Sequence, residues 1–192
     1  SRGEPLVSKE IIPMLKYSER KFLNLKMNTN ASLLTEKISH AILSDTIKTL
    51  VFSADAADPE LYKKLRVNGS LEKILKNIEI FNKIKKKYYP KSKIITRVSG
   101  VKVNEQQSFD SMKKLWSGLV DQVAFVDYNP WESVYSTPKN DIVKPCSELW
   151  RRMFVWWDGK VNPCDTDYKS VLSSETFPET SLKEIWTGSN YK

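Results

Sequence analysis

The sequence of 192 residues predicts an α/β fold of parallel βα units, followed by a small domain that contains a β-hairpin. Over residues 1–126, short apolar runs alternate with amphipathic stretches of about ten to twenty residues, which is typical of parallel βα units. After residue 143 the pattern changes to an aromatic segment around Asp158-Gly159, a dipeptide that favours a hairpin turn. The predicted strands could close a barrel or form a doubly wound sheet, because periodicity does not separate these two architectures.

The first half of the βα region contains four predicted elements. Residues 8–18 begin with a Ser suited to an N-cap and place apolar side chains on one face, which predicts a helix. Residues 22–27 alternate apolar and polar side chains, which predicts a strand. Residues 32–43 are predicted as a helix, and residues 48–53 as a short, buried strand.

The second half repeats the alternation. After a short helix, residues 70–89 carry Leu, Ile and Phe at helical spacing, which predicts a long helix that ends in a Lys-rich run. A strand over 94–103, a helix over 107–119 and a strand over 122–126 follow. Right-handed crossovers predict that the helices lie on one side of the sheet.

Cys146 and Cys164 are the only cysteines, and with Gly159 they form the pattern C-x12-G-x4-C. We expect a two-residue type I′ turn at Asp158-Gly159, which would bring the two thiols near each other at the open end of the hairpin. Two thiolates are half of a four-coordinate iron–sulfur or zinc site. Asp165 and Asp167 follow the second cysteine and could act as acid or base, or form a solvated turn. A helix after the hairpin is predicted from residue 181, where Ser181 and Glu184 have the spacing of a capping box.

The formal net charge of +8 permits an anionic partner, although a solvated lysine surface explains it as well. No apolar run approaches a membrane span, and the opening residues are not those of a signal peptide. A disulfide in a secreted protein is an alternative for the cysteine pair, but thiolate ligands in a reducing cytoplasm fit the spacing better, so we expect a cytoplasmic protein. His40 is the only histidine, which argues against a His-based catalytic triad.

Ligands of parallel βα folds bind at the carboxyl ends of the strands, and several candidate residues fall there. Gly3, Glu4 and Pro5 precede the first helix, where Gly permits close backbone approach and a carboxylate can accept from an ammonium group. Asn30 follows the first predicted strand, in a position that also suits an ordinary loop.

Three further candidates follow the second predicted strand. Ser53 and Asp55 could hydrogen-bond a ribose or cap the next helix. Arg66 could clamp a carboxylate in a bidentate manner, although a surface arginine is equally ordinary.

The order of these motifs resembles the core of radical S-adenosylmethionine (SAM) enzymes from its second strand onward. The motifs are Gly-Glu-Pro, Thr-Asn-x-x-Leu-Leu, Ser-x-Asp and Leu-Arg-x-x-Gly-Ser. The cysteine pattern, with Glu148-Leu-Trp before the hairpin and Ser181-Leu-Lys-Glu-Ile-Trp after it, resembles the SPASM domain that extends many of these enzymes. The resemblance implies a partial TIM-like (βα) barrel over residues 1–143 and the N-terminal part of a SPASM domain over 144–192.

The resemblance also implies the cofactors. Gly3, Glu4 and Pro5 would contact the amino group of SAM, Ser53 its ribose and Arg66 its carboxylate, with Asn30 and Asp55 in the same site. Cys146 and Cys164 would ligate an auxiliary [4Fe–4S] cluster. The CxxxCxxC loop that holds the SAM-binding [4Fe–4S] cluster and the later SPASM cysteines are not in this sequence, so we expect a fragment that is inactive alone.

The implied reaction of the full-length protein is reductive cleavage of SAM to a 5′-deoxyadenosyl radical, which abstracts hydrogen from a peptide, protein or small-molecule substrate. Flavodoxin or ferredoxin would donate the electron. The competing hypothesis is a non-catalytic basic α/β domain that binds nucleic acid or a protein partner and has a zinc half-site. It explains the charge and the cysteine pair but leaves the order of the motifs unexplained.

Overall fold

The computed structural model describes residues 3–44, 47–128, 130, 134–136, 144–173 and 175–189. Contacts divide the chain into one compact unit from Gly3 to Tyr128 and a second that contains the residues from 129 onward. Most of residues 129–143 lie outside the described residues, so a domain boundary near residue 143 stays a prediction. Among the helices of the described residues, none has both the length and the apolar character needed to cross a membrane.

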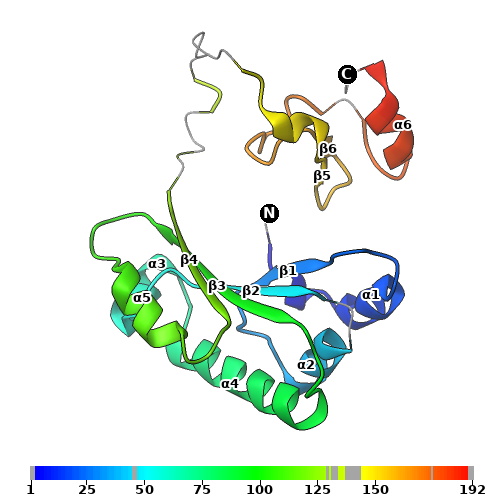
Figure 1. Ribbon diagram of the computed structural model, residues 1–192. Helices are drawn as coiled ribbons and strands as arrows, with labels where there is room; N and C mark the ends of the chain where they lie inside the picture. The colour runs from blue at the N-terminus through cyan, green and yellow to red at the C-terminus, as the bar shows by residue number, and fades with distance from the viewer. Residues whose placement is uncertain are drawn as a thin grey trace. The chain divides into compact units, whose positions relative to one another are not determined.

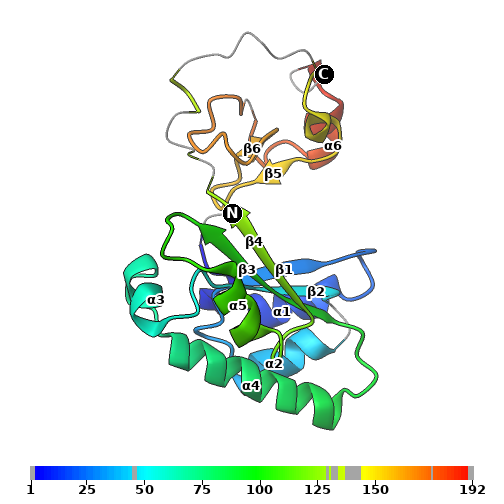
Figure 2. The same cartoon turned by 60° about the vertical axis from the view of Figure 1, so that its left-hand side comes forward.

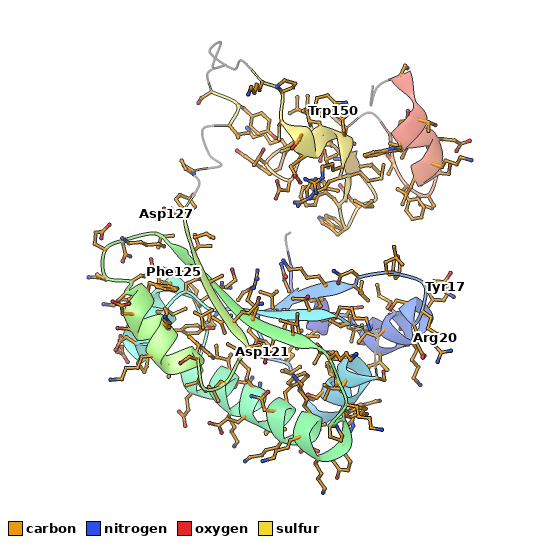
Figure 3. The ribbon with its side chains drawn as sticks, in the orientation of Figure 1. Tyr17, Arg20, Asp121, Phe125, Asp127 and Trp150 are labelled. Carbon is orange, nitrogen blue, oxygen red and sulfur yellow. The ribbon has the colours of Figure 1, made fainter. Side chains whose placement is uncertain are left out.

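The first unit is built on a parallel sheet of four strands, as the alternation of elements predicts (Figure 1). The strands are β1 (Lys26–Thr29), β2 (Thr49–Ser53), β3 (Ile95–Lys102) and β4 (Gln122–Asp127), and they pair in chain order. In the register, Asn28 lies beside Val51, which lies beside Arg97 on the next strand. All four carboxyl ends therefore lie at one edge of the sheet, the edge at which β4 ends in Asp127 (Figure 3).

Among the described residues, one α-helix precedes β1 and four connect the strands, and a side chain caps the N-terminus of each of these four. The five helices are α1 (Ile11–Ser18), α2 (Glu36–Leu43), α3 (Pro59–Leu65), α4 (Leu71–Tyr88) and α5 (Phe109–Trp116). Thr35, Asp58, Ser70 and Ser108 each accept a hydrogen bond from a backbone N–H of the first turn. Helices α2, α4 and α5 lie on the same side of the sheet in both views, as expected (Figures 1 and 2).

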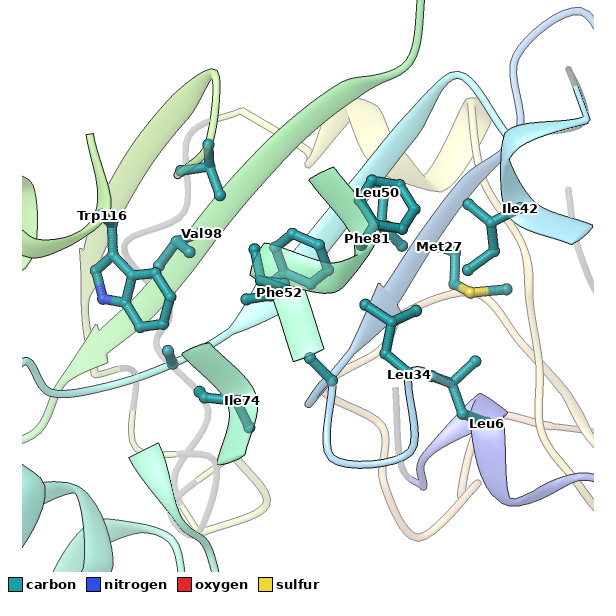
Figure 4. Packing of buried hydrophobic residues seen from close by; sticks show 14 of the residues in the cluster. Leu6, Met27, Leu34, Ile42, Leu50, Phe52, Ile74, Phe81, Val98 and Trp116 are labelled. Atoms are coloured by element: carbon teal, nitrogen blue, oxygen red, sulfur yellow. The ribbon is translucent and has the colours of Figure 1, made fainter. Parts of the chain in front are cut away.

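The hydrophobic core lies between these helices and the sheet (Figure 4). Phe52 of β2 meets Phe81 of α4 edge-to-face, with ring centroids 6.2 Å apart. Trp116 and Val98 are both fully buried farther along the sheet. Burial of each such side chain contributes about 1.5–3 kcal/mol, so this face fixes the sheet against its helices.

The opposite face of the sheet carries polar and exposed side chains. Asn28, Ile95 and Val126 are exposed there. Arg97 crosses to the neighbouring strand, where its Nε and Nη2 donate to Oε1 of Gln122 at 2.8 and 2.6 Å. In the expected partial barrel, this face would be the interior.

Three sequence predictions in this unit need correction. The helix expected from residue 8 begins at Ile11, with Glu10 and not Ser8 at its N-cap. The strand expected at 22–27 is wrong, because Leu23 is fully exposed and pairing begins only where the Lys48 N–H donates to the Leu25 carbonyl. The helix expected from residue 32 begins four residues later. Ala31 has a φ of +58°, and Thr35 is the N-cap whose hydroxyl accepts from Ile38 N at 3.3 Å.

The described part of the second unit contains a short 3₁₀-helix, η3 (Ser147–Trp150), the strands β5 (Phe154–Val155) and β6 (Val161–Asn162), and α6 (Leu182–Thr187). The strands pair antiparallel, so the predicted hairpin is confirmed. The predicted capping box at the start of α6 is also present, with the Ser181 and Glu184 side chains bonded to each other's backbone N–H.

The turn of the hairpin differs from the prediction. Gly159 has a φ of +84° and its N–H donates to the Trp156 carbonyl, but Asp158 does not have the positive φ that a type I′ turn requires. A Cβ on Gly159 would lie only 2.2 Å from the Phe177 carbonyl oxygen. Close approach to the segment beyond the hairpin therefore requires a glycine here.

Candidate functional site

Glu4 joins the start of the first unit to the end of β1. It caps the 3₁₀-helix η1 (Pro5–Val7), and its Oε1 accepts from Leu6 N at 3.1 Å and from the Thr29 hydroxyl at 2.6 Å. Its Oε2 accepts from Asn30 N at 2.7 Å. The structure thus brings three predicted site residues, Glu4, Pro5 and Asn30, to one place at the carboxyl end of β1.

The backbone around this cluster is shaped for close approach. Gly3 is exposed, has a φ of +107° and would have open space around a Cβ. The Asn30 Oδ1 accepts from Ser32 N at 2.9 Å, which tightens the turn after β1. Within the described residues the Asn30 Nδ2 has no partner, so the amide keeps a donor for a ligand.

Asp55 and Arg66 form an ion pair just beyond the end of β2. The Arg66 Nε donates to Asp55 Oδ2 at 2.6 Å, and Asp55 Oδ1 accepts from Val101 N of β3 at 2.9 Å. The Arg66 side chain is 32% exposed, and its terminal nitrogens have no partner among the described residues. A guanidinium oriented through Nε in this way can still bind a carboxylate with its other donors.

The short link after α3 requires the glycine of the Leu-Arg-x-x-Gly-Ser motif. A Cβ on Gly69 would lie 2.8 Å from the Arg66 carbonyl oxygen and 2.9 Å from the Tyr62 ring. Burial raises the pKa of Tyr62, with Arg66 opposing the shift and Asp55 adding to it. Tyr62 is therefore a neutral packing partner of the ion pair at physiological pH.

Ser53 is the last residue of β2 and is half-buried. Because Thr29 pairs with Phe52, Asn30 and Ser53 follow at neighbouring strand ends. Ser53 itself lies beside Ser99 of β3 in the register. The predicted residues from Gly3 to Arg66 thus occupy the carboxyl ends of adjacent strands, where the sequence placed them.

Gln107 supports this edge of the sheet, although it was not predicted as a site residue. Its Nε2 donates to the carbonyls of Asp55 and Val101, both at 2.7 Å, and its Oε1 accepts from the N–H groups of Val103 and Asn104 at 2.6 and 3.1 Å. The side chain is only 4% exposed. A glutamine directly before the N-cap of a helix looks like an ordinary loop residue, so only the fold reveals its role.

Cys146 and Cys164 are both free thiols, the first exposed and the second half-buried. The Cys164 Sγ lies 3.0 Å from the Thr166 hydroxyl and 3.9 Å from Asp165 Oδ1. Among the described residues, no group of three or more His, Cys, Asp or Glu side chains could hold a metal ion. A metal site at these cysteines would therefore need ligands from outside the described residues.

Asp167 is not in a solvated turn. It is 3% exposed, and it accepts from the Tyr135 hydroxyl at 2.5 Å and from the N–H groups of Val171 and Leu172, both at 2.9 Å. Asn162 is buried, and its amide has partners for both oxygen and nitrogen in one orientation. In that orientation the nitrogen donates to Asp167 Oδ2 at 3.1 Å. The pKa of Tyr135 is raised, mainly by burial and also by its hydrogen bond to Asp167. Asp167 is thus the centre of a buried polar cluster that organises the loop after Cys164.

Comparisons with known proteins agree with this arrangement. The SPASM family, described as an iron–sulfur cluster-binding domain, matches residues 146–192. No match was found among curated protein sequences.

Solved structures of SuiB from Streptococcus suis share the fold. The structure bound to S-adenosylmethionine matches with a TM-score of 0.70 at 14% identity, and the one bound to the precursor peptide SuiA with 0.68 at 14%. Each match covers 97% of this chain and 53% of the SuiB chain, so this chain spans about half the length of the structures it matches. The predicted α/β class and the predicted SPASM segment are therefore confirmed, and the chain shares the fold of SuiB.

Proposed function

We propose that this chain provides the SAM-facing half-barrel and the first auxiliary-cluster ligands of a radical SAM enzyme. The observation that carries the proposal is the Asp55–Arg66 pair at the carboxyl ends of β2 and β3, where one carboxylate orients a guanidinium and leaves its terminal nitrogens available. The Glu4–Asn30 cluster at the end of the neighbouring strand gives the same edge a carboxylate and a free amide donor.

These groups match the three polar parts of SAM. Glu4, with the backbone of Gly3 and Pro5, would accept from the amino group. Ser53 would bond the ribose, and the terminal nitrogens of Arg66 would bind the carboxylate. Asp55 accepts from the Arg66 guanidinium and from Val101 N, so its proposed role is to hold Arg66 and the end of β3 in place.

The bound SAM and its cluster would supply the radical chemistry, which is reductive cleavage and hydrogen abstraction from a substrate. The SuiB structure with its precursor peptide favours a peptide as that substrate. Cys146 and Cys164 would hold an auxiliary cluster, and we propose flavodoxin or ferredoxin as the electron donor and the cytoplasm as the location. With only two cysteines, the 192-residue chain alone should not release 5′-deoxyadenosine.

Calorimetric titration of SAM into the protein tests the binding site. Arg66→Met should weaken SAM binding about tenfold or more, because a hydrogen-bonded charge is lost. The matched control is Lys63→Met, which removes an exposed cation from the last turn of α3. Equal affinities for the two variants would contradict the assignment of Arg66.

Iron analysis of the full-length protein after anaerobic reconstitution tests the cluster, because these 192 residues carry only two cysteines. Cys164→Ala should lose iron and the associated visible absorbance, because a thiolate ligand is removed. Absence of iron from the parent protein, together with steeply salt-dependent binding of an oligonucleotide, would instead favour the basic binding domain.

A further inference from the structure

We infer that Thr166 is a positioning residue for Cys164, and that its hydroxyl raises the reduction potential and the retention of the cluster bound there. This inference rests on the proposed function, in which Cys164 is a cluster ligand. It concerns the contact with the ligand sulfur and not the identity of the substrate.

The contact is a hydrogen bond whose direction is set by iron binding. Thr166 Oγ1 and Cys164 Sγ are 3.0 Å apart. A thiolate that ligates iron has no proton, so the hydroxyl is then the only possible donor. Within the described residues, Thr166 is the one side-chain donor within hydrogen-bond distance of this sulfur.

The loop is built to hold that hydroxyl in place. The Asp167 N–H donates to the Cys164 carbonyl at 3.3 Å, and the Tyr168 N–H donates to the Thr166 carbonyl at 2.8 Å. Buried Asp167 in turn accepts from Val171 N and Leu172 N. Thr166 therefore lies between a ligand residue and a buried anchor.

The neighbouring carboxylate acts in the opposite direction. Asp165 Oδ1 lies 3.9 Å from the same sulfur, where a carboxylate charge would repel the negative charge added on reduction of the cluster. Reduction adds negative charge that the cluster sulfurs share, so a donor on the sulfur stabilises the reduced form more than the oxidised form. The Thr166 hydroxyl therefore opposes the destabilisation of the reduced cluster by Asp165, because both groups lie near the Cys164 sulfur.

The test is a dithionite titration of the reconstituted full-length protein, followed by electron paramagnetic resonance, with iron release to a chelator measured in parallel. Thr166→Val should shift the potential to lower values and release iron about tenfold faster, since a hydrogen bond to a charged group is lost. Thr166→Ser keeps the hydroxyl and should behave as the parent. Thr187→Val is the matched control, because that hydroxyl donates to the Lys183 carbonyl in α6.

Two outcomes would overturn the inference, and they are distinguishable. If the parent binds the cluster and Thr166→Val matches it in both potential and iron release, the inference is wrong and the proposed function stands. If the full-length parent binds no iron under conditions in which it remains folded, the proposed function fails and the inference fails with it.

Discussion

At the scale of single residues, Gln107 shows how specific the supporting contacts of the site are. Its amide nitrogen faces two carbonyl oxygens and its amide oxygen faces two N–H groups. Only a side chain with a donor on one end and an acceptor on the other satisfies all four groups. A carboxylate of the same shape would place negative charge against the carbonyls of Asp55 and Val101.

Gln107→Glu should therefore destabilise the protein by about 2–3 kcal/mol at pH 7.5, through buried groups left without partners. Burial and the two carbonyls would raise the pKa of the introduced acid in the folded state. Its neutral form can donate, so the loss should shrink toward pH 5 and grow as pH rises through that pKa. Urea unfolding at both pH values measures the difference.

The control is Gln106→Glu, at the exposed neighbouring position. It should change the free energy of unfolding by about 0.5 kcal/mol or less at either pH. A Gln107→Glu variant as stable as this control would show that the four contacts do not support the edge of the sheet.

At the scale of elements, features that depend on nearby residues were predicted better than features that depend on contacts far along the chain. Helix α4 was predicted within one residue at each end, because its Ser70 cap and buried apolar side chains at helical spacing are written in its own sequence. The start of β1 was missed, because it depends on pairing with β2 across the sheet. The type I′ turn failed for the same reason, since the Phe177 segment shapes the turn at Gly159.

The site divides in the same way. The order of the motifs placed Glu4, Asn30 and Arg66 at strand ends, because the carboxyl ends of parallel strands share one edge. The groups that hold them there could not be predicted. Val101 N–H and the Gln107 amide come from segments that only the folded sheet brings to Asp55.

Asp121 links two elements by hydrogen bonds that depend on pH. It precedes β4, and its Oδ2 accepts from the N–H and the hydroxyl of Thr96 in β3 at 2.7 and 2.8 Å. Burial alone would raise the pKa of Asp121, but these two bonds and the nearby Lys85 lower it overall. A lowered pKa means that the link stabilises the fold above about pH 4 and is lost as pH falls below that value.

Asp121→Asn should destabilise the protein by about 1 kcal/mol at pH 7, because the amide replaces a charged acceptor by a neutral one. The difference between variant and parent should shrink toward pH 3, as the carboxylate becomes protonated. Chemical denaturation at the two pH values measures it, with Asp127→Asn at the exposed end of β4 as control. A penalty that is the same at both pH values would assign the effect to packing and not to charge.

At the scale of the whole molecule, the two units have different sources of stability. The first unit has a continuous hydrophobic core. In the described part of the second unit, the buried apolar side chains are Val161 and Ile185. The other buried side chains, Asn162 and Asp167, belong to the polar cluster. A unit with so small an apolar core usually needs a metal or another covalent link to remain folded.

Removal of iron with a chelator should therefore loosen the second unit selectively. Hydrogen exchange should rise by about tenfold or more over residues 147–173, because ligand binding is coupled to folding there. Residues 49–102 should keep their protection, which serves as the internal control. Equal protection of the second unit with and without iron would show that its polar cluster alone is sufficient.

The pairing of the strands in chain order has a consequence for synthesis on the ribosome. β2 pairs with β1, β3 with β2 and β4 with β3, so each strand after β1 finds a partner already present when it leaves the exit tunnel. No segment has to wait for one made much later, which shortens the time that a sheet edge stays unprotected. The first unit can thus assemble vectorially, one βα unit after another, before the cysteines of the second have been translated.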